Sequence, residues 1–88
     1  MKICYSSKFL REYQKLPLSV KKLAEAKEKI FRKNPFDPRL KTHKLKGGLN
    51  EFLSFSINNQ YRIIFEFRDP PVVWFHSVGD HSIYRLWD

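Results

Sequence analysis

The chain has 88 residues, of which 42% are apolar and 16% aromatic, and its formal net charge at pH 7 is +8. This length suits one domain, residues 1–88, and excludes separate cofactor and substrate domains. One cysteine, Cys4, excludes an intramolecular disulfide, and no Cys/His spacing resembles a zinc site. No apolar run approaches the ~20 residues that span a bilayer, and the N-terminus lacks a signal peptide's apolar stretch. We therefore expect a cytoplasmic protein with no metal, no small-molecule cofactor and no membrane partner.

The positive charge is concentrated in the first half of the chain. Residues 1–46 carry 14 Lys and Arg against 4 Asp and Glu, whereas residues 47–88 carry 3 against 5. The densest stretch, Arg32 to Lys46, has six basic side chains and one acid, Asp37. Such a stretch favours a polyanion or an acidic protein segment as partner, with salt-sensitive binding. A solvated basic face that only aids solubility is the alternative.

The first 38 residues predict a short strand and two helices. Lys2–Tyr5 is the strand, and Ser6 or Ser7 offers a hydroxyl N-cap for the first helix. Apolar residues then recur at helical spacing at Phe9, Leu10, Tyr13 and Leu16. Pro17 suits the start of a second helix. Its apolar stripe consists of Val20, Leu23, Ala24, Lys27, Ile30 and Phe31. Asn34-Pro35 and Asp37-Pro38 end this helix and start an extended crossing.

From Leu49 onward the apolar period changes to two, which predicts a β-hairpin. Leu53–Ile57 and Tyr61–Phe67 flank Asn58-Asn59-Gln60. A two-residue turn would push Arg62 into the apolar face, whereas a three-residue turn pairs Phe55 with Ile63 and Ser56 with Arg62. We therefore predict the three-residue loop, with an asparagine near the left-handed conformation, as such loops usually require.

The last third of the chain predicts one more long strand. Arg68-Asp69-Pro70-Pro71 forms a turn, and Val72–Val78 is apolar on both faces, as an interior strand is. Gly79-Asp80 breaks it, and His81–Arg85 is a final short strand or turn. The order is β-α-α-β-β-β, an α+β fold of two layers. We expect the helical hairpin to cover the apolar face of an antiparallel sheet and to leave the face of Arg62 open.

Three segments bring chemistry toward this open face: His43 before the first hairpin strand, Arg62 in mid-sheet, and His81 with Tyr84 near the C-terminus. Metal-independent RNA cleavage needs a base for the 2′-hydroxyl, a cation for the charge on phosphorus, and an acid for the leaving 5′-oxygen. His43, Arg62 and His81 have the chemistry for these roles in that order. Because no Asp/Glu cluster could hold two magnesium ions, a two-metal nuclease is disfavoured.

Each candidate also has a structural explanation. His43 before a strand and His81 after Gly-Asp are common surface or turn residues. Arg62 and Glu66 lie on one face of the same strand, so an ion pair between them is the alternative role of this arginine. His76 lies in the interior strand, where we expect a structural role.

The ordered motifs of the second half resemble the RelE/ParE superfamily of type II toxin–antitoxin toxins. The segments that carry the resemblance are His43-Lys44-Leu45-Lys46-Gly47, Leu53-Ser54-Phe55-Ser56-Ile57, Tyr61-Arg62-Ile63-Ile64-Phe65-Glu66-Phe67 and Val78-Gly79-Asp80-His81-Ser82-Ile83-Tyr84-Arg85. The motifs cover about residues 43–85, and the element order covers the whole chain. The resemblance implies the RelE-like two-layer fold.

It also implies a ribosome-dependent endoribonuclease that cleaves mRNA in the ribosomal A site and is neutralised by a cognate antitoxin. By position, His43 corresponds to the general base and Arg62 to the arginine that stabilises the scissile phosphate. His81 and Tyr84 correspond to the C-terminal acid or base-stacking group. The resemblance matches Lys44 and Lys46 to the basic approach to the phosphate backbone, and we expect RNA contacts at Lys41 and Arg85 as well.

Two departures from the family pattern bear on the C-terminal roles. Several ribonuclease members carry a further arginine before the Gly-x-His turn, where this chain has His76 or Ser77. The aromatic residue follows His81 by three positions, against four in some relatives. A gyrase-inhibiting toxin of the ParE branch, or a binding module that has lost activity, is the alternative function; the joint presence of His43, Arg62 and His81 favours the ribonuclease.

Overall fold

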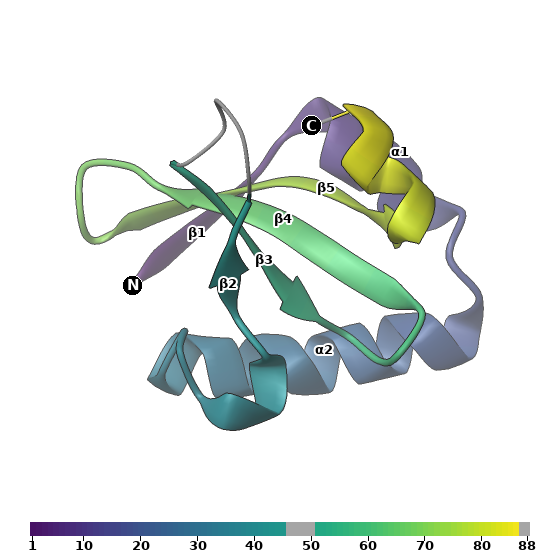
Figure 1. Cartoon of the computed structure of the whole chain (residues 1–88), viewed down its shortest axis with the longest axis horizontal. Coiled ribbons are helices and arrows are strands. Elements are labelled where there is room, and N and C mark those ends of the chain that lie inside the picture. Colours follow the sequence, from purple (N-terminus) through teal and green to yellow (C-terminus); the bar gives the residue numbers. More distant parts are fainter. Residues whose placement is uncertain (46–50, 87–88) are drawn as a thin grey trace.

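The structure, a computed structural model, describes the backbone of residues 1–45 and 51–86 and the side chains of these ranges through Tyr84. Figure 1 shows the chain. Its elements in order, with η for a 3₁₀ helix, are β1 (Lys2–Tyr5), α1 (Ser7–Gln14), α2 (Leu18–Lys33), η1 (Pro38–Leu40), β2 (His43–Lys44), β3 (Phe52–Ser56), β4 (Tyr61–Phe67), β5 (Val72–Asp80) and η2 (His81–Leu86).

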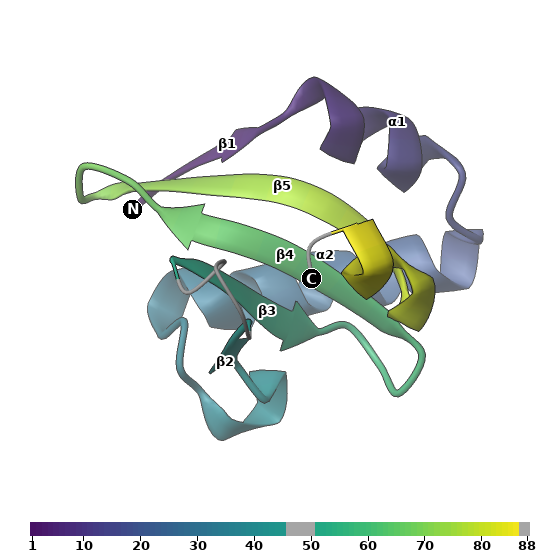
Figure 2. The ribbon, with the colours of Figure 1, turned by 45° about the horizontal axis from the view of Figure 1, so that its top comes forward.

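The molecule has the two layers that the sequence predicts. The helix α2 crosses one face of the five-stranded sheet, α1 lies beside β5, and η2 lies on the opposite side of the sheet from α2 (Figures 1 and 2). Both helices begin where the sequence places them: the Ser6 hydroxyl accepts a hydrogen bond from the Phe9 amide, and Pro17 is the N-cap of α2. The α+β fold class is therefore confirmed, and no described helix is long and apolar enough to cross a membrane.

The sheet order is β1-β5-β4-β3-β2. The pairs β2–β3, β3–β4 and β4–β5 are antiparallel, but β1 pairs with β5 in parallel. The predicted antiparallel sheet is therefore confirmed for three of the four strand pairs, and the edge pair β1–β5 is the exception. Strand β1 pairs with β5, about 70 residues away in the chain, with Lys2 opposite Val72. The alternation of apolar and polar residues does not indicate whether two such distant strands pair in parallel or antiparallel.

The β3–β4 hairpin has the predicted register. Phe55 pairs with Ile63, and Ser56 pairs with Arg62. The asparagine expected in the left-handed conformation is absent, since the residues with positive φ among those described are Lys41 and Asp69. Instead, the Asn58 side-chain oxygen accepts the amides of residues 60 and 61, at 2.9 and 2.8 Å, so a side chain closes the turn.

The main core lies between the sheet and the helices. Phe31 of α2 is fully buried and contacts Phe55 and Phe65, each with ring centroids 4.9 Å apart, and Phe75 at 5.4 Å. These rings join α2 to three strands at once. Because edge-to-face and offset aromatic pairs contribute beyond the area they bury, this cluster is the principal tie between the layers.

The far face of the sheet is less open than predicted. Ile64 of β4 points to this face, is fully buried, and packs with Leu45 and with Ile83 of η2. Partly buried Phe52 and Tyr84 adjoin this second cluster. The segment expected to be a short strand or turn is thus a 3₁₀ helix that covers part of the face of Arg62.

Strand β5 is longer and less regular than predicted. It continues through Gly79 to Asp80, opposite Arg62 and Tyr61, so the expected break at Gly79-Asp80 was wrong. Its interior position, between β1 and β4, is confirmed. The register shifts near His76, because Ile64 pairs with residue 77 and Phe65 with residue 75. This bulge changes the facing of the residues beyond it.

The Glu12 carboxylate of α1 takes the place of a strand partner where β1 has ended. It accepts hydrogen bonds from the buried Ser77 hydroxyl at 2.8 Å and from the Val78 amide at 3.2 Å. Glu12→Ala leaves both donors unpaired, and we expect a loss of about 1–3 kcal/mol in the free energy of unfolding. Urea denaturation measures it. Glu12→Gln, which keeps an acceptor oxygen, should lose less; equal losses would contradict this role.

Candidate active site

The strand register places His43 and Arg62 on the same face of the sheet. His43 pairs with Ser54, which pairs with Ile64, and directly paired residues point to one face. Arg62 lies two residues from Ile64 along β4 and points the same way. Two strand spacings and two residues separate the Cα atoms of His43 and Arg62 by about 12 Å. This face is the one that η2 partly covers.

Arg62 is half-buried and turned toward the hairpin. Its Nη1 donates to the carbonyl oxygens of Asn58 and Tyr61, the second at 3.1 Å. Within the described part of the chain, both hydrogen bonds of this guanidinium leave from Nη1, so its Nε–Nη2 edge is available to a further acceptor. That edge has the fork geometry that matches two oxygens of a phosphate. Glu66 bonds to His76 and Arg68 instead, so the alternative ion pair with Arg62 is not formed.

His43 is exposed and held by the chain that leads into β2. Lys41, in the left-handed conformation after η1, directs its carbonyl oxygen to His43 Nδ1 at 3.1 Å. Because a carbonyl oxygen only accepts, Nδ1 carries the proton, and Nε2 of the neutral ring keeps its lone pair. The ring is thus oriented with its basic nitrogen directed away from the backbone, as a general base requires.

His81 lies at the hairpin end of this face. It starts η2 directly after Asp80, whose carboxylate accepts from the Ser82 amide and hydroxyl. These bonds, together with the nearby His81, lower the pKa of Asp80. His81, Ser82 and Asp80 line a shallow hollow of about 400 Å³ with Gln60 of the hairpin. The loop whose carbonyls hold Arg62 therefore also borders His81.

Tyr84 links the two ends of the site. Its hydroxyl lies 2.6 Å from the Ser54 hydroxyl, on the β3 residue that pairs with His43, and its ring is 5.9 Å from the His81 ring. One aromatic side chain thus spans from the His43 side of β3 to the start of η2. The partnership with Ser54 was not predicted, since thirty residues separate the pair and no local pattern connects them.

Gly79 allows η2 to lie this close to the sheet. A Cβ at position 79 would be 2.5 Å from Cγ2 of buried Ile83. We expect Gly79→Ala to displace η2, break the Tyr84–Ser54 bond and cost about 1–3 kcal/mol, measured by thermal unfolding. Adding Ile83→Leu, which removes the offending methyl, should recover part of that loss. If the losses in stability from the two substitutions simply added, the close contact between residues 79 and 83 would be contradicted.

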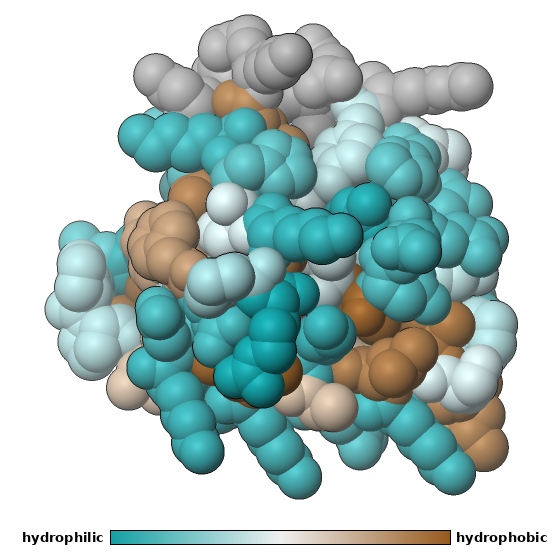
Figure 3. All heavy atoms as spheres, turned by 60° about the horizontal axis from the view of Figure 1, so that its bottom comes forward, coloured by the Kyte–Doolittle hydropathy of each residue, from teal (hydrophilic) through white to brown (hydrophobic). Residues whose placement is uncertain are grey.

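The structure describes the side chains of two of the four predicted RNA contacts. Lys41 and Lys44 are exposed beside the site, but Lys44 pairs with Leu53 and therefore points to the opposite side of β2 from His43. Lys46 and the side chain of Arg85 lie outside the described residues. Arg32, Lys33 and Arg39, at the end of α2 and in η1, are also exposed. Together with Lys41 and Lys44 they form a basic flank beside the site. Figure 3 shows the α2 face, where long hydrophilic side chains project between separate apolar patches.

The sequence predicted only part of the role of a second group of side chains around His76. His76, expected to be structural, has its Nε2 2.9 Å from a Glu66 oxygen, and its ring lies against Phe52 (5.3 Å) and Trp74 (6.4 Å). His76 or Ser77 occupies the region where several relatives carry an arginine, and Ser77 is buried with its hydroxyl donating to Glu12 of α1. Ser77 pairs with Ile64 and so lies on the His43 side of the sheet, but its hydroxyl is bonded to Glu12, and a serine supplies no cation to the candidate site.

Comparison with known proteins adds evidence on the fold. No family model and no curated protein matches the sequence. A YoeB/ParE toxin from Agrobacterium tumefaciens matches with a TM-score of 0.77 at 16% identity, covering 92% of this chain and 99% of that one. The YoeB dimer structure from Staphylococcus aureus gives 0.76 at 22% identity, covering 92% and 97%. The chain has the fold of the RelE/ParE toxins. A chain of the E. coli DinJ-YafQ toxin-antitoxin complex also matches, at 0.67 and 17% identity over 93% of each chain.

This likeness spans nearly the whole of each chain and confirms the resemblance at the level of the fold. Sequence identities of 16–22% carry no residue roles across. The chemistry of the His43–Arg62 face must therefore be argued from this chain's own side chains.

Proposed function

We propose that the protein is the toxin of a type II toxin–antitoxin system and cleaves mRNA on the ribosome without a metal. The observation that carries the proposal is the available Nε–Nη2 edge of Arg62, on the same face as a histidine whose Nε2 is left basic. A cationic fork and an oriented base are two of the three groups that metal-independent RNA cleavage needs, and His81 is the candidate for the third, the acid. The fold shared with YoeB and YafQ supports it.

In the proposed reaction, His43 Nε2 takes the proton of a ribose 2′-hydroxyl, and the 2′-oxygen attacks the adjacent phosphorus. Arg62 stabilises the additional negative charge on the phosphoryl oxygens. The bond from phosphorus to the 5′-oxygen breaks, and protonated His81 gives that oxygen a proton. The products are a 2′,3′-cyclic phosphate and a 5′-hydroxyl end. Tyr84, beside His81, is placed to stack on a base or hold the leaving nucleotide.

The cognate antitoxin is the proposed protein partner. The exposed basic flank from Arg32 to Lys44 suits an acidic segment that orders on binding. The DinJ-YafQ complex, a toxin bound to its antitoxin on the same fold, supports this partnership. Because the proposed partners are an antitoxin and mRNA on the ribosome, the proposed site of action is the cytoplasm.

Mapping RNA 5′ ends after brief induction in growing cells tests the function. Wild-type protein should produce new 5′-hydroxyl ends within translated messages, and His43→Ala should produce few. Intact messages together with trapped DNA breaks would assign the protein to the gyrase-inhibiting branch. Intact messages and normal growth would indicate that the protein is a binding module without toxin activity.

A further inference from the structure

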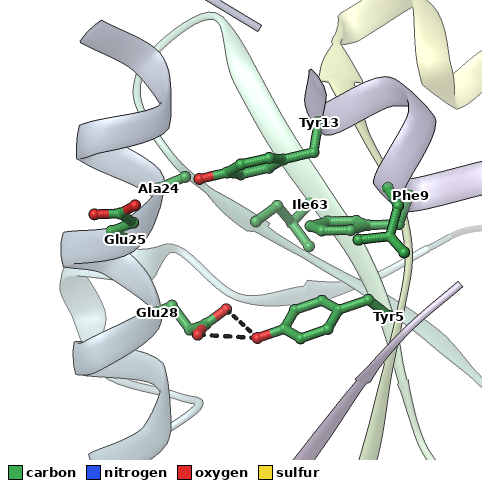
Figure 4. A pocket seen from close by; sticks show the side chains of 8 residues that line it. Tyr5, Phe9, Tyr13, Ala24, Glu25, Glu28 and Ile63 are labelled. Atoms are coloured by element: carbon green, nitrogen blue, oxygen red, sulfur yellow. Dashed lines mark hydrogen bonds between the residues drawn. The ribbon is translucent and has the colours of Figure 1, made fainter. Parts of the chain in front are cut away.

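A separate cavity of about 250 Å³ opens between α1, α2 and β1, on the helix side of the sheet (Figure 4). It plays no part in the candidate active site. Its lining consists of Tyr5, Phe9, Leu10, Tyr13, Ala24, Glu25, Glu28 and Ile63. Two phenol rings reach from β1 and α1 toward α2, and the two glutamates lie on α2 opposite them (Figure 4).

Three aromatic rings form one wall of this pocket. Tyr5 and Phe9 have ring centroids 5.5 Å apart, and Phe9 and Tyr13 stack at 5.8 Å. Leu10 is 51% exposed at the rim, and Tyr5 is 37% exposed. The pocket therefore combines aromatic faces, which attract cations, with an apolar entrance.

The opposite wall is acidic, in a chain that is strongly basic overall. The Tyr5 hydroxyl donates to Glu28, with its oxygens at 3.0 and 3.1 Å, and so fixes the carboxylate in place. Burial and then the charge of Glu28 raise the pKa of Tyr5. Burial, followed by the charges of Glu25 and Glu28, raises the pKa of Tyr13. The Tyr5 phenol thus experiences the negative charge of Glu28, and the Tyr13 phenol that of both glutamates.

Cations of the chain itself already border this wall. Arg32 Nη2 lies 3.5 Å from Glu28, and Lys21 Nζ lies 5.9 Å from the centre of the Tyr13 ring while donating to the Gln14 carbonyl. Glu28 therefore accepts a cation while it holds the Tyr5 hydroxyl. Glu25, exposed on the next turn of α2, adds a second carboxylate for an incoming positive group.

We infer that this pocket anchors one arginine or lysine side chain of a partner protein. The apolar stem packs on Phe9 and Ile63, and the cationic head meets Glu25, Glu28 and the tyrosine rings. The cavity is smaller than the ~300–1,000 Å³ of ordinary ligand sites. A free ligand small enough to fill it would gain too little binding energy to offset the entropy that it loses on binding. A side chain presented by a protein avoids most of that cost. The inference does not depend on RNA cleavage.

NMR titration of the ¹⁵N-labelled protein tests it with a blocked Ala-Arg-Ala peptide and its citrulline twin, a neutral isostere. We expect saturable shifts at the amides of Tyr5, Tyr13 and Glu28 with the arginine peptide, and at least threefold weaker binding of the citrulline peptide. Equal binding of the two, or saturation confined to other residues, would overturn the inference. Binding of n-butylguanidinium without binding of the peptide would overturn the assignment to a protein partner.

Two matched variants locate the charge effect. Glu25→Gln and Glu28→Gln should each weaken the arginine peptide at least threefold, whereas Glu51→Gln, an exposed glutamate outside the pocket, should not. Glu25 is exposed, so its substitution leaves the fold intact. If neither pocket variant changes the affinity, the acidic wall plays no part and the inference is wrong.

Discussion

Arg62→Ala is expected to reduce RNA cleavage by a factor of about 10³, because removal of a preorganised donor to a developing charge typically costs 10²–10³ in rate. The loss should appear in the cleavage step and not in RNA binding, which the exposed lysines share. Single-turnover cleavage of a message on purified ribosomes, with binding measured separately, checks both parts.

Arg62→Lys keeps the charge and removes the fork, so it should recover only part of the activity. Arg68→Ala is the matched control, because this exposed arginine comes directly after β4 and pairs with Glu66 at 3.1 Å. It should stay within about twofold of wild type, as an exposed ion pair contributes little. Arg62 also donates to the hairpin carbonyls, so the circular dichroism spectra of the variants must match. Cleavage by a folded Arg62→Ala protein at the wild-type rate would contradict the proposed mechanism.

The parts of the fold that follow from local pattern were predictable. Helical spacing, the Ser6 cap and Pro17 placed both helices. The hairpin register followed from one physical constraint, since only one pairing keeps the Arg62 guanidinium out of the apolar face. Burial decides such cases because a one-residue slip would reverse every side chain of a strand.

The parts that depend on contacts between distant segments were not predictable. The parallel pairing of β1 with β5 and the Tyr84–Ser54 bond join residues far apart in the chain. The 3₁₀ helix η2 owes its position to Gly79 and Ile83, a fit of shapes that no periodicity encodes. The asparagine turn shows a similar limit: the sequence indicated a three-residue loop, but whether the Asn58 backbone or side chain closes it depends on local energies.

For the candidate site, the chemistry of the side chains was predictable and their orientation was not. The sequence indicated His43, Arg62, His81 and Tyr84 as candidates. Only the structure turns Arg62 toward the hairpin end, beside the His81 hollow, and places His43 across β3 with its Nδ1 held by Lys41. A substrate that reaches both histidines must therefore lie across β3, along Tyr84.

The stability of this scaffold should depend most on Phe31. Phe31→Ala removes a ring that is fully buried and contacts aromatic side chains of β3, β4 and β5. Such truncations cost about 3–5 kcal/mol. A chain of this size has a free energy of unfolding of only about 4–13 kcal/mol. Chemical denaturation should show a large fall in the midpoint, and at the weaker end of that range the variant should be substantially unfolded at 37 °C.

Phe36→Ala is the matched control, since this phenylalanine is 58% exposed and its ring meets only the edge residue Phe67 at 6.1 Å among the described aromatic contacts. It should change the free energy of unfolding by less than about 1 kcal/mol. Phe31→Leu, which keeps much of the buried volume, should fall between the two. Comparable losses for Phe31→Ala and Phe36→Ala would mean that the four-ring cluster does not hold α2 to the sheet. In that case the edge contact between residues 36 and 67 would have to carry a larger share of the coupling between the layers.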